Sequence, residues 1–223
     1  MRSTWKLVVG AAMLVVGAVL GLTVPMDAQS LPNPWLREAY RVVFFHMPFA
    51  FAGTICFMQA AVFAGLYLGR RNLLDDRAAL GSAELGLIML TLATVTGMIF
   101  ARCQWGMWWN WDPRETSVFF VLLIYAAYLM LRQALPQDEA LRARVSSAYL
   151  LLAVAPMVWL VAIFPRTVGQ AANSLHPTQP PLHTMHWRII FWQLAALLLV
   201  GSWLTDVQRR IAKRQMALWE DGR

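Results

Sequence analysis

Charged residues are scarce in this sequence of 223 residues: only 14% are Asp, Glu, Lys or Arg, whereas 59% are hydrophobic. Soluble domains carry about 25% charged residues, and the mean hydropathy of this chain is +0.50. This shortage excludes a soluble globular domain and indicates a lipid bilayer as the main surroundings of the folded chain. The formal net charge of +7 does not predict nucleic-acid binding, because the cations lie in short clusters between apolar runs.

Cysteine is also scarce. The chain contains Cys56 and Cys103 only, far apart in the sequence, and neither C-x-x-C nor C-x-x-C-H occurs. These absences exclude a redox dithiol and a covalently attached c-type haem. Internal repeats and low-complexity segments are absent too.

Long apolar runs bounded by charged residues, Gly or Pro are the main feature that is present. About 20 apolar residues, rising 1.5 Å each, cross the hydrocarbon as a helix. The first run could be a signal peptide, but it is longer than the usual core of about 7–15 residues and no small-x-small cleavage site follows, so we expect a helix. The sequence predicts an all-α, polytopic membrane protein with a single integral membrane domain over residues 1–223. The six expected spans are residues 7–24, 47–68, 83–101, 113–135, 147–164 and 188–205.

The distribution of cations predicts the orientation, because Lys and Arg are enriched in cytoplasmic loops. With the N-terminus inside, 13 of the 19 cations lie on the inner side and six on the outer side. We therefore expect both termini to be cytoplasmic. The extracytoplasmic face then holds all four histidines, a tryptophan cluster and a Pro-rich loop.

Two helix starts can be recognised on this outer face. Asn33 followed by Pro34 is typical of an N-cap and a first helical residue, and it predicts a short amphipathic helix in the membrane interface. Asp112 is followed by Pro113 and then by Glu115 as the third helical residue. This pattern predicts Asp112 as the N-cap of the fourth span.

The strongest motif has four tryptophans within seven residues, namely Trp105, Trp108, Trp109 and Trp111. If the stretch is helical, Trp105, Trp108 and Trp109 share one face with Asp112. That face would form a broad aromatic surface, suited to a flat, apolar ligand. An aromatic belt at the membrane interface is the alternative.

The histidines are candidate metal ligands. His46 precedes Pro48, where the missing N–H and the bulky ring predict a bend, and His176, His183 and His186 lie in the loop before the sixth span. Two neutral imidazoles on opposite sides of a planar macrocycle would fill both axial positions of haem iron. Zinc at His183-x-x-His186 is a weaker alternative, because no thiol or second carboxylate stands near it. An inert polar role is the other possibility for these two histidines.

Charged side chains at the same membrane edge are the third element. Arg114 is the arginine that we single out, because a guanidinium there can pair with a carboxylate such as a haem propionate. Snorkelling to the interface is the alternative for Arg114, and N-capping alone is the alternative for Asp112. The other outer cations are Arg37, Arg41, Arg102, Arg166 and Arg188.

Residues 102–116 resemble the tryptophan-rich "WWD" signature of the haem-handling family in cytochrome c biogenesis. The matching residues are Trp105, Gly106, Trp108, Trp109, Trp111, Asp112, Arg114 and Thr116. Six spans, with His46 before the motif and His176 after it, are similar to the branch called haem exporter protein C, or CcmC.

This resemblance implies haem b as a non-covalent cofactor, with His46 and His176 on the iron. It further implies a haem-binding and transfer protein rather than an enzyme, facing the periplasm from the bacterial inner membrane. The implied partners are a membrane-tethered haem chaperone and the subunits of an ATP-binding-cassette (ABC) transporter. The residues expected to contact haem are Trp105, Trp108, Trp109, Trp111, Asp112 and Arg114.

Other functions remain open. Glu115 stands where the C branch commonly has Leu, so a haem lyase or synthase subunit that attaches haem to apocytochrome c is the runner-up. A b-type electron-transfer subunit would usually bury histidine pairs within its spans, and the span interiors contain none. His183 or His186 could also replace His176 as the second axial ligand.

Overall fold

The computed structural model describes residues 3–29, 31–171, 174–176 and 180–221, most of which are helical. Six helices are long and apolar enough to cross a membrane, which confirms the predicted all-α fold and its number of candidate spans. The elements are α1 (Thr4–Thr23), α2 (Pro34–Ala39), the 3-10 turn η1 (Tyr40–Val42), α3 (Val43–Arg70), α4 (Leu73–Trp105), α5 (Pro113–Ala134), α6 (Glu139–Val158), the π-helical segment η2 (Trp159–Ile163), α7 (Phe164–Ala171) and α8 (Thr184–Asp221).

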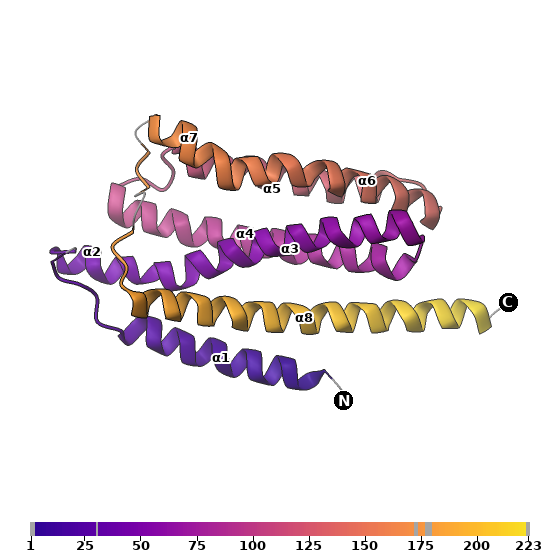
Figure 1. Ribbon diagram of the computed structural model, residues 1–223, viewed down its shortest axis with the longest axis horizontal. Coiled ribbons are helices and arrows are strands. Elements are labelled where there is room, and N and C mark those ends of the chain that lie inside the picture. The colour runs from indigo at the N-terminus through magenta and orange to yellow at the C-terminus, as the bar shows by residue number, and fades with distance from the viewer. Residues whose placement is uncertain (1–2, 30, 172–173, 177–179, 222–223) are drawn as a thin grey trace.

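The long helices run side by side, with both termini at one end of the bundle (Figure 1). Helices α3 and α4 form the central pair, α1 packs along α8 on one side, and α5 packs with α6 on the other. Helices α2 and α7 lie at the end opposite the termini (Figure 1). The α4–α5 connection and the segment before α8 therefore meet at that same end, which carries the candidate site.

Close packing of the central pair depends on small residues. A Cβ added to Gly53 of α3 would lie 3.1 Å from the backbone nitrogen of Leu90 and 3.2 Å from the carbonyl oxygen of Gly86, both in α4. Small residues at such contacts let two helix backbones approach each other within a membrane. Aromatic packing links this pair to α5, because the Phe57 ring stacks on Tyr125 with centroids 3.5 Å apart.

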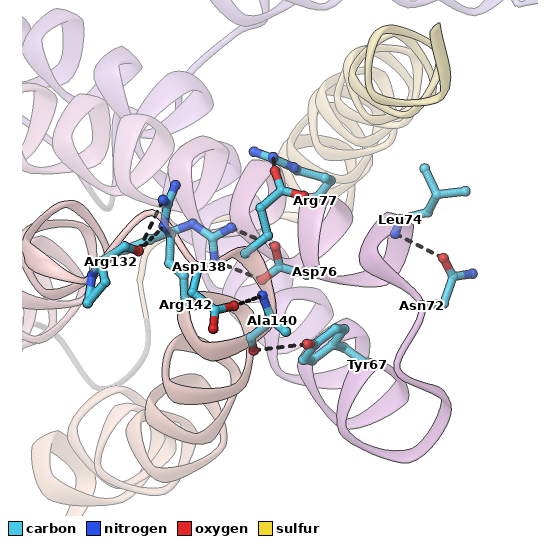
Figure 2. A network of polar contacts seen from close by, with 11 residues as sticks. Tyr67, Asn72, Leu74, Asp76, Arg77, Arg132, Asp138, Ala140 and Arg142 are labelled. Atoms are coloured by element: carbon cyan, nitrogen blue, oxygen red, sulfur yellow. Dashed lines mark hydrogen bonds and ion pairs between the residues drawn. The ribbon is translucent and has the colours of Figure 1, made fainter. Parts of the chain in front are cut away.

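A buried ion pair fastens α5 to α4 near the end that carries the termini (Figure 2). The Arg132 guanidinium donates to both carboxylate oxygens of Asp76, over 2.7 and 2.6 Å. The two side chains are only 9% and 4% exposed. Nearby, the Tyr67 hydroxyl donates to the carbonyl of Ala140 over 3.3 Å and joins α3 to α6. Polar contacts therefore hold this end of the bundle together, away from the candidate site.

Two local predictions on the outer segments have different outcomes. Asn33 caps α2 as expected, since its side-chain oxygen accepts from the backbone nitrogens of Trp35 and Leu36. Helix α3 continues through Pro48 and is preceded by a 3-10 turn at Tyr40–Val42, and a bend of the helix at Pro48 stays a prediction. Proline removes only the hydrogen bond to one carbonyl, so the helix can continue past it.

Candidate functional site

The tryptophan-rich segment is an extended loop rather than a helix. Helix α4 ends at Trp105, Gly106 adopts a left-handed conformation with φ of 82°, and α5 begins at Pro113. Glycine at this position ends a helix at little conformational cost. The shared face predicted for Trp105, Trp108, Trp109 and Asp112 required a helix, and this segment is not helical.

Asp112 is the N-cap of α5, as the sequence predicted. Its Oδ1 accepts from the backbone nitrogen of Arg114 over 2.9 Å. The Glu115 carboxylate completes a capping box by accepting from the backbone nitrogen of Asp112, and it also accepts from that of Asn110 over 2.7 Å. Capping thus fixes the end of the tryptophan-rich loop to the start of α5.

Asp112 also binds the segment before α8. Its Oδ2 accepts from the Ser174 hydroxyl and from the backbone nitrogen of Leu175, both over 2.7 Å. Its Oδ1 accepts from Nδ1 of His176 over 2.8 Å. Burial alone would raise the pKa of Asp112, but the hydrogen bonds from His176, Ser174 and Arg114 outweigh it and lower the pKa well below its usual range. The carboxylate therefore stays charged and orients the His176 ring.

His46 is oriented by the neighbouring helix α4. Its Nδ1 lies 2.9 Å from the carbonyl oxygen of Ala93, and a carbonyl can only accept, so Nδ1 carries the proton. The ring fits against α4 because residue 97 is glycine: a Cβ there would lie 3.0 Å from Cε1 of His46. In both His46 and His176 the protein forms a hydrogen bond with Nδ1. Nε2 of each ring then has a lone pair that can bind a metal ion.

Both histidines line one cavity of about 730 Å³ at this end of the bundle. A second, adjoining cavity of about 310 Å³ shares both histidines and extends towards the apolar interior of the bundle. Volumes in this range suit a ligand of cofactor size. Other lining residues of the larger cavity include Tyr40, Phe51, Phe100, Arg114, Arg166 and Trp187.

Two arginines line both cavities. The sequence predicts Arg114 as a ligand-binding residue but does not single out Arg166 from the other outer cations. Within the part of the chain that the structure describes, the Arg114 guanidinium has no hydrogen-bond acceptor. Two cations on an apolar cavity favour a ligand that carries carboxylate groups. The sequence signal for Arg166 was weak, because only its position at a membrane edge was visible.

The four predicted tryptophans are not equivalent. The Trp105 ring meets the His176 ring edge-on, with centroids 4.9 Å apart, although Trp105 does not line either cavity. Trp109 lines the smaller cavity, and its buried Nε1 has no partner among the described residues. Trp108 and Trp111 are 54% and 67% exposed and line neither cavity. Of the four indoles, that of Trp109 therefore lines a histidine cavity, that of Trp105 contacts the His176 ring, and the other two lie on the surface.

The remaining histidines lie outside the cavity. His186 is only 2% exposed, and both ring nitrogens are engaged, by the carbonyl of Pro25 and the backbone nitrogen of His183. The His183 side chain is 66% exposed and lies 3.6 Å from Asp27. Across the described residues, no three His, Cys, Asp or Glu side chains converge as a metal site would need. This geometry favours His176, rather than His183 or His186, as the histidine that could bind the same ligand as His46.

Comparison with known proteins identifies the family. The family described as heme exporter protein C matches residues 2–220, nearly the whole chain. The chain belongs to the CcmC family. Its expected resemblance to CcmC is therefore confirmed.

Individual relatives named heme exporter protein C share about a quarter to a third of their aligned residues with this chain. The heme exporter protein C of Paracoccus denitrificans is 30% identical over 136 residues, which cover 61% of this chain and 54% of that relative. The Rhodobacter capsulatus protein of the same name is 33% identical over 99 residues, 44% of this chain and 41% of its own. The chain thus spans about half the length of these two relatives. The Escherichia coli CcmC is 26% identical over 211 residues, 92% of this chain and 81% of its own.

Proposed function

We propose that this chain binds one haem in the cavity between His46 and His176 and passes it on during cytochrome c maturation. The observation that carries the proposal is that both imidazoles line one cavity while the protein engages Nδ1 of each. The free Nε2 atoms of His46 and His176 would hold the haem iron by coordinating it. The carboxylate of Asp112 increases the basicity of the His176 imidazole, as outer-shell partners of metal ligands do.

The cavity also fits the rest of the haem. Arg114 and Arg166 line it and can pair with the two propionates, while Phe51 and Phe100 provide apolar surface for the macrocycle. Trp105 supports the His176 ring. In this proposal Trp108 and Trp111, which are exposed, contact a partner or the edge of the haem rather than the floor of the cavity.

Membership of the CcmC family supports a role in haem handling. The finer assignment rests on the charge asymmetry of the sequence, which favours the termini in the cytoplasm and the site at the periplasmic face of the inner membrane. We propose that the receiver is a membrane-tethered haem chaperone and that ABC transporter subunits assist. His176 is suited to release haem during transfer, because it lies outside the long helices, whereas His46 lies within one.

Haem content tests the ligand assignment. His46→Ala and His176→Ala should each lower the haem absorption band of the purified protein strongly, because each removes one axial ligand. His183→Ala is the matched control, since that exposed side chain lies outside the cavity, and it should keep the haem of the wild type. Unchanged haem in both ligand variants would overturn the proposal.

A second experiment separates transfer from catalysis. Haem-loaded protein is incubated in parallel with an apo haem chaperone and with apocytochrome c, and it should lose its absorption band to the chaperone. If it instead attached haem covalently to apocytochrome c, the lyase alternative would replace the transfer proposal.

A further inference from the structure

Another cavity is lined by polar side chains of the segments near the two termini, and Figure 1 shows both termini at the end of the bundle opposite α2 and α7. It has a volume of about 370 Å³ and lies between the start of α1 and the later part of α8. Its lining residues are Ser3, Asp206, Arg209, Arg210 and Lys213. The haem proposal uses none of them.

The cations of this cavity are not balanced by nearby acids. Asp206, the acid in its lining, forms a 2.7 Å ion pair with Lys6, which neutralises it. Arg209 is 4.0 Å from Asp75, a weak pair at most, and its buried Nε has no hydrogen-bond partner among the described residues. Arg210 and Lys213 are both exposed. Three cations therefore face one cavity with free hydrogen-bond donors.

Hydrogen bonds already hold part of this cluster in place. Arg210 donates to the Ser3 hydroxyl and to the backbone carbonyl of Asp206. The guanidinium of Arg209 lies over the Phe63 ring, 4.8 Å from its centroid. Such contacts reduce the side-chain freedom that would be lost when an anion binds.

The cavity lies beside the ends of the apolar runs of α1 and α8. Trp5, at the start of α1, is 56% exposed, and exposed tryptophan is enriched at the level of lipid headgroups. The apolar run of α1 begins after Lys6, and the cations of α8 follow its own apolar stretch. The cavity therefore lies at the ends of two apolar runs, where the phosphates of a lipid leaflet would be expected.

We propose that this cavity binds the phosphate-bearing headgroup of an anionic phospholipid. Guanidinium groups can form paired hydrogen bonds with phosphate oxygens, and basic pockets between membrane helices suit acidic headgroups. A bound lipid would bridge α1 and α8, which otherwise meet here through the Lys6–Asp206 pair and the Arg210–Ser3 contact. A free phosphate ion offers the same chemistry and is distinguished by experiment.

The test measures lipid binding to the full-length protein in detergent by native mass spectrometry. Phosphatidylglycerol should bind more tightly than phosphatidylcholine. The double variant Arg210→Gln, Lys213→Gln should weaken phosphatidylglycerol binding by on the order of 30-fold, because each cation near a lipid surface contributes about a factor of five. The control double variant Arg70→Gln, Arg144→Gln removes two exposed cations that do not line the cavity, and it should change binding less than about threefold.

Three outcomes would overturn the proposal. These are equal binding of the two lipids, equal losses in the two double variants, and displacement of phosphatidylglycerol by millimolar inorganic phosphate, which would indicate a site for a soluble anion. Both double variants should keep a single cooperative thermal unfolding transition, which shows that they fold. The outcome is independent of the haem proposal.

Discussion

Replacing Asp112 by asparagine tests the link between the helix cap and the proposed axial ligand. Each carboxylate oxygen accepts two hydrogen bonds, Oδ1 from Arg114 and His176, and Oδ2 from Ser174 and Leu175. An amide has only one oxygen. Either of its two orientations must therefore place an NH₂ group against backbone and side-chain donors.

The two orientations of the amide fail in different ways. With the oxygen towards His176, the backbone N–H of Leu175 loses its acceptor, at a cost of about 1–3 kcal/mol. With the NH₂ group towards His176, the ring must accept at Nδ1 and carry its proton on Nε2, which removes the lone pair meant for iron. Removing such outer-shell partners lowers metal affinity by about 10–100-fold, or roughly 1.4–2.7 kcal/mol.

Haem titration of the apo-protein in detergent, followed by the absorption band, measures this effect. Asp112→Asn should raise the dissociation constant by about 10–100-fold. Asp138→Asn is the matched control, because Asp138 caps α6 through a single oxygen that an amide can replace, and it should leave the dissociation constant unchanged. If Asp112→Asn folded normally and bound haem like the wild type, the reasoning on His176 would be refuted.

Two further predictions concern the bundle and the other histidine. Arg132→Met should lower the free energy of unfolding by about 3–5 kcal/mol, because it leaves a buried carboxylate without its partner. Arg77→Met removes an exposed ion pair and should lower that free energy by less than about 1 kcal/mol. Equal losses in denaturant unfolding would contradict this prediction. Gly97→Ala should lower haem content, because the added Cβ crowds the His46 ring. Gly69→Ala is the control and should not lower it, because a Cβ there has no atom within 4 Å. Equal haem content in both variants would contradict the proposed position of His46.

Features that depend on neighbouring residues were predictable from the sequence. The apolar runs gave the six candidate spans, because crossing a bilayer requires a continuous apolar helix. Asn33 and Asp112 were predicted as caps, because capping requires a short polar side chain directly before a helix. The assignment of His46 and His176 as haem ligands, from their positions on either side of the tryptophan-rich motif, stays a prediction.

Features that depend on contacts between distant segments were not predictable. Asp112 and His176 are 64 residues apart, and no local pattern predicts their hydrogen bond. The same holds for Arg166, whose part in the cavity depends on the packing of α7 against α5. The sequence is compatible with a helix over the tryptophan-rich segment, but Gly106 ends α4 and Trp108 and Trp111 lie on the surface.

Electron paramagnetic resonance of the haem-loaded, oxidised protein tests the central claim most directly. Two imidazoles on one iron predict a low-spin, six-coordinate signal in the wild type. His46→Gly and His176→Gly should each convert it to a high-spin signal, and added imidazole should restore the low-spin form by filling the vacated position. A low-spin signal that survives unchanged in either variant would contradict joint ligation by His46 and His176.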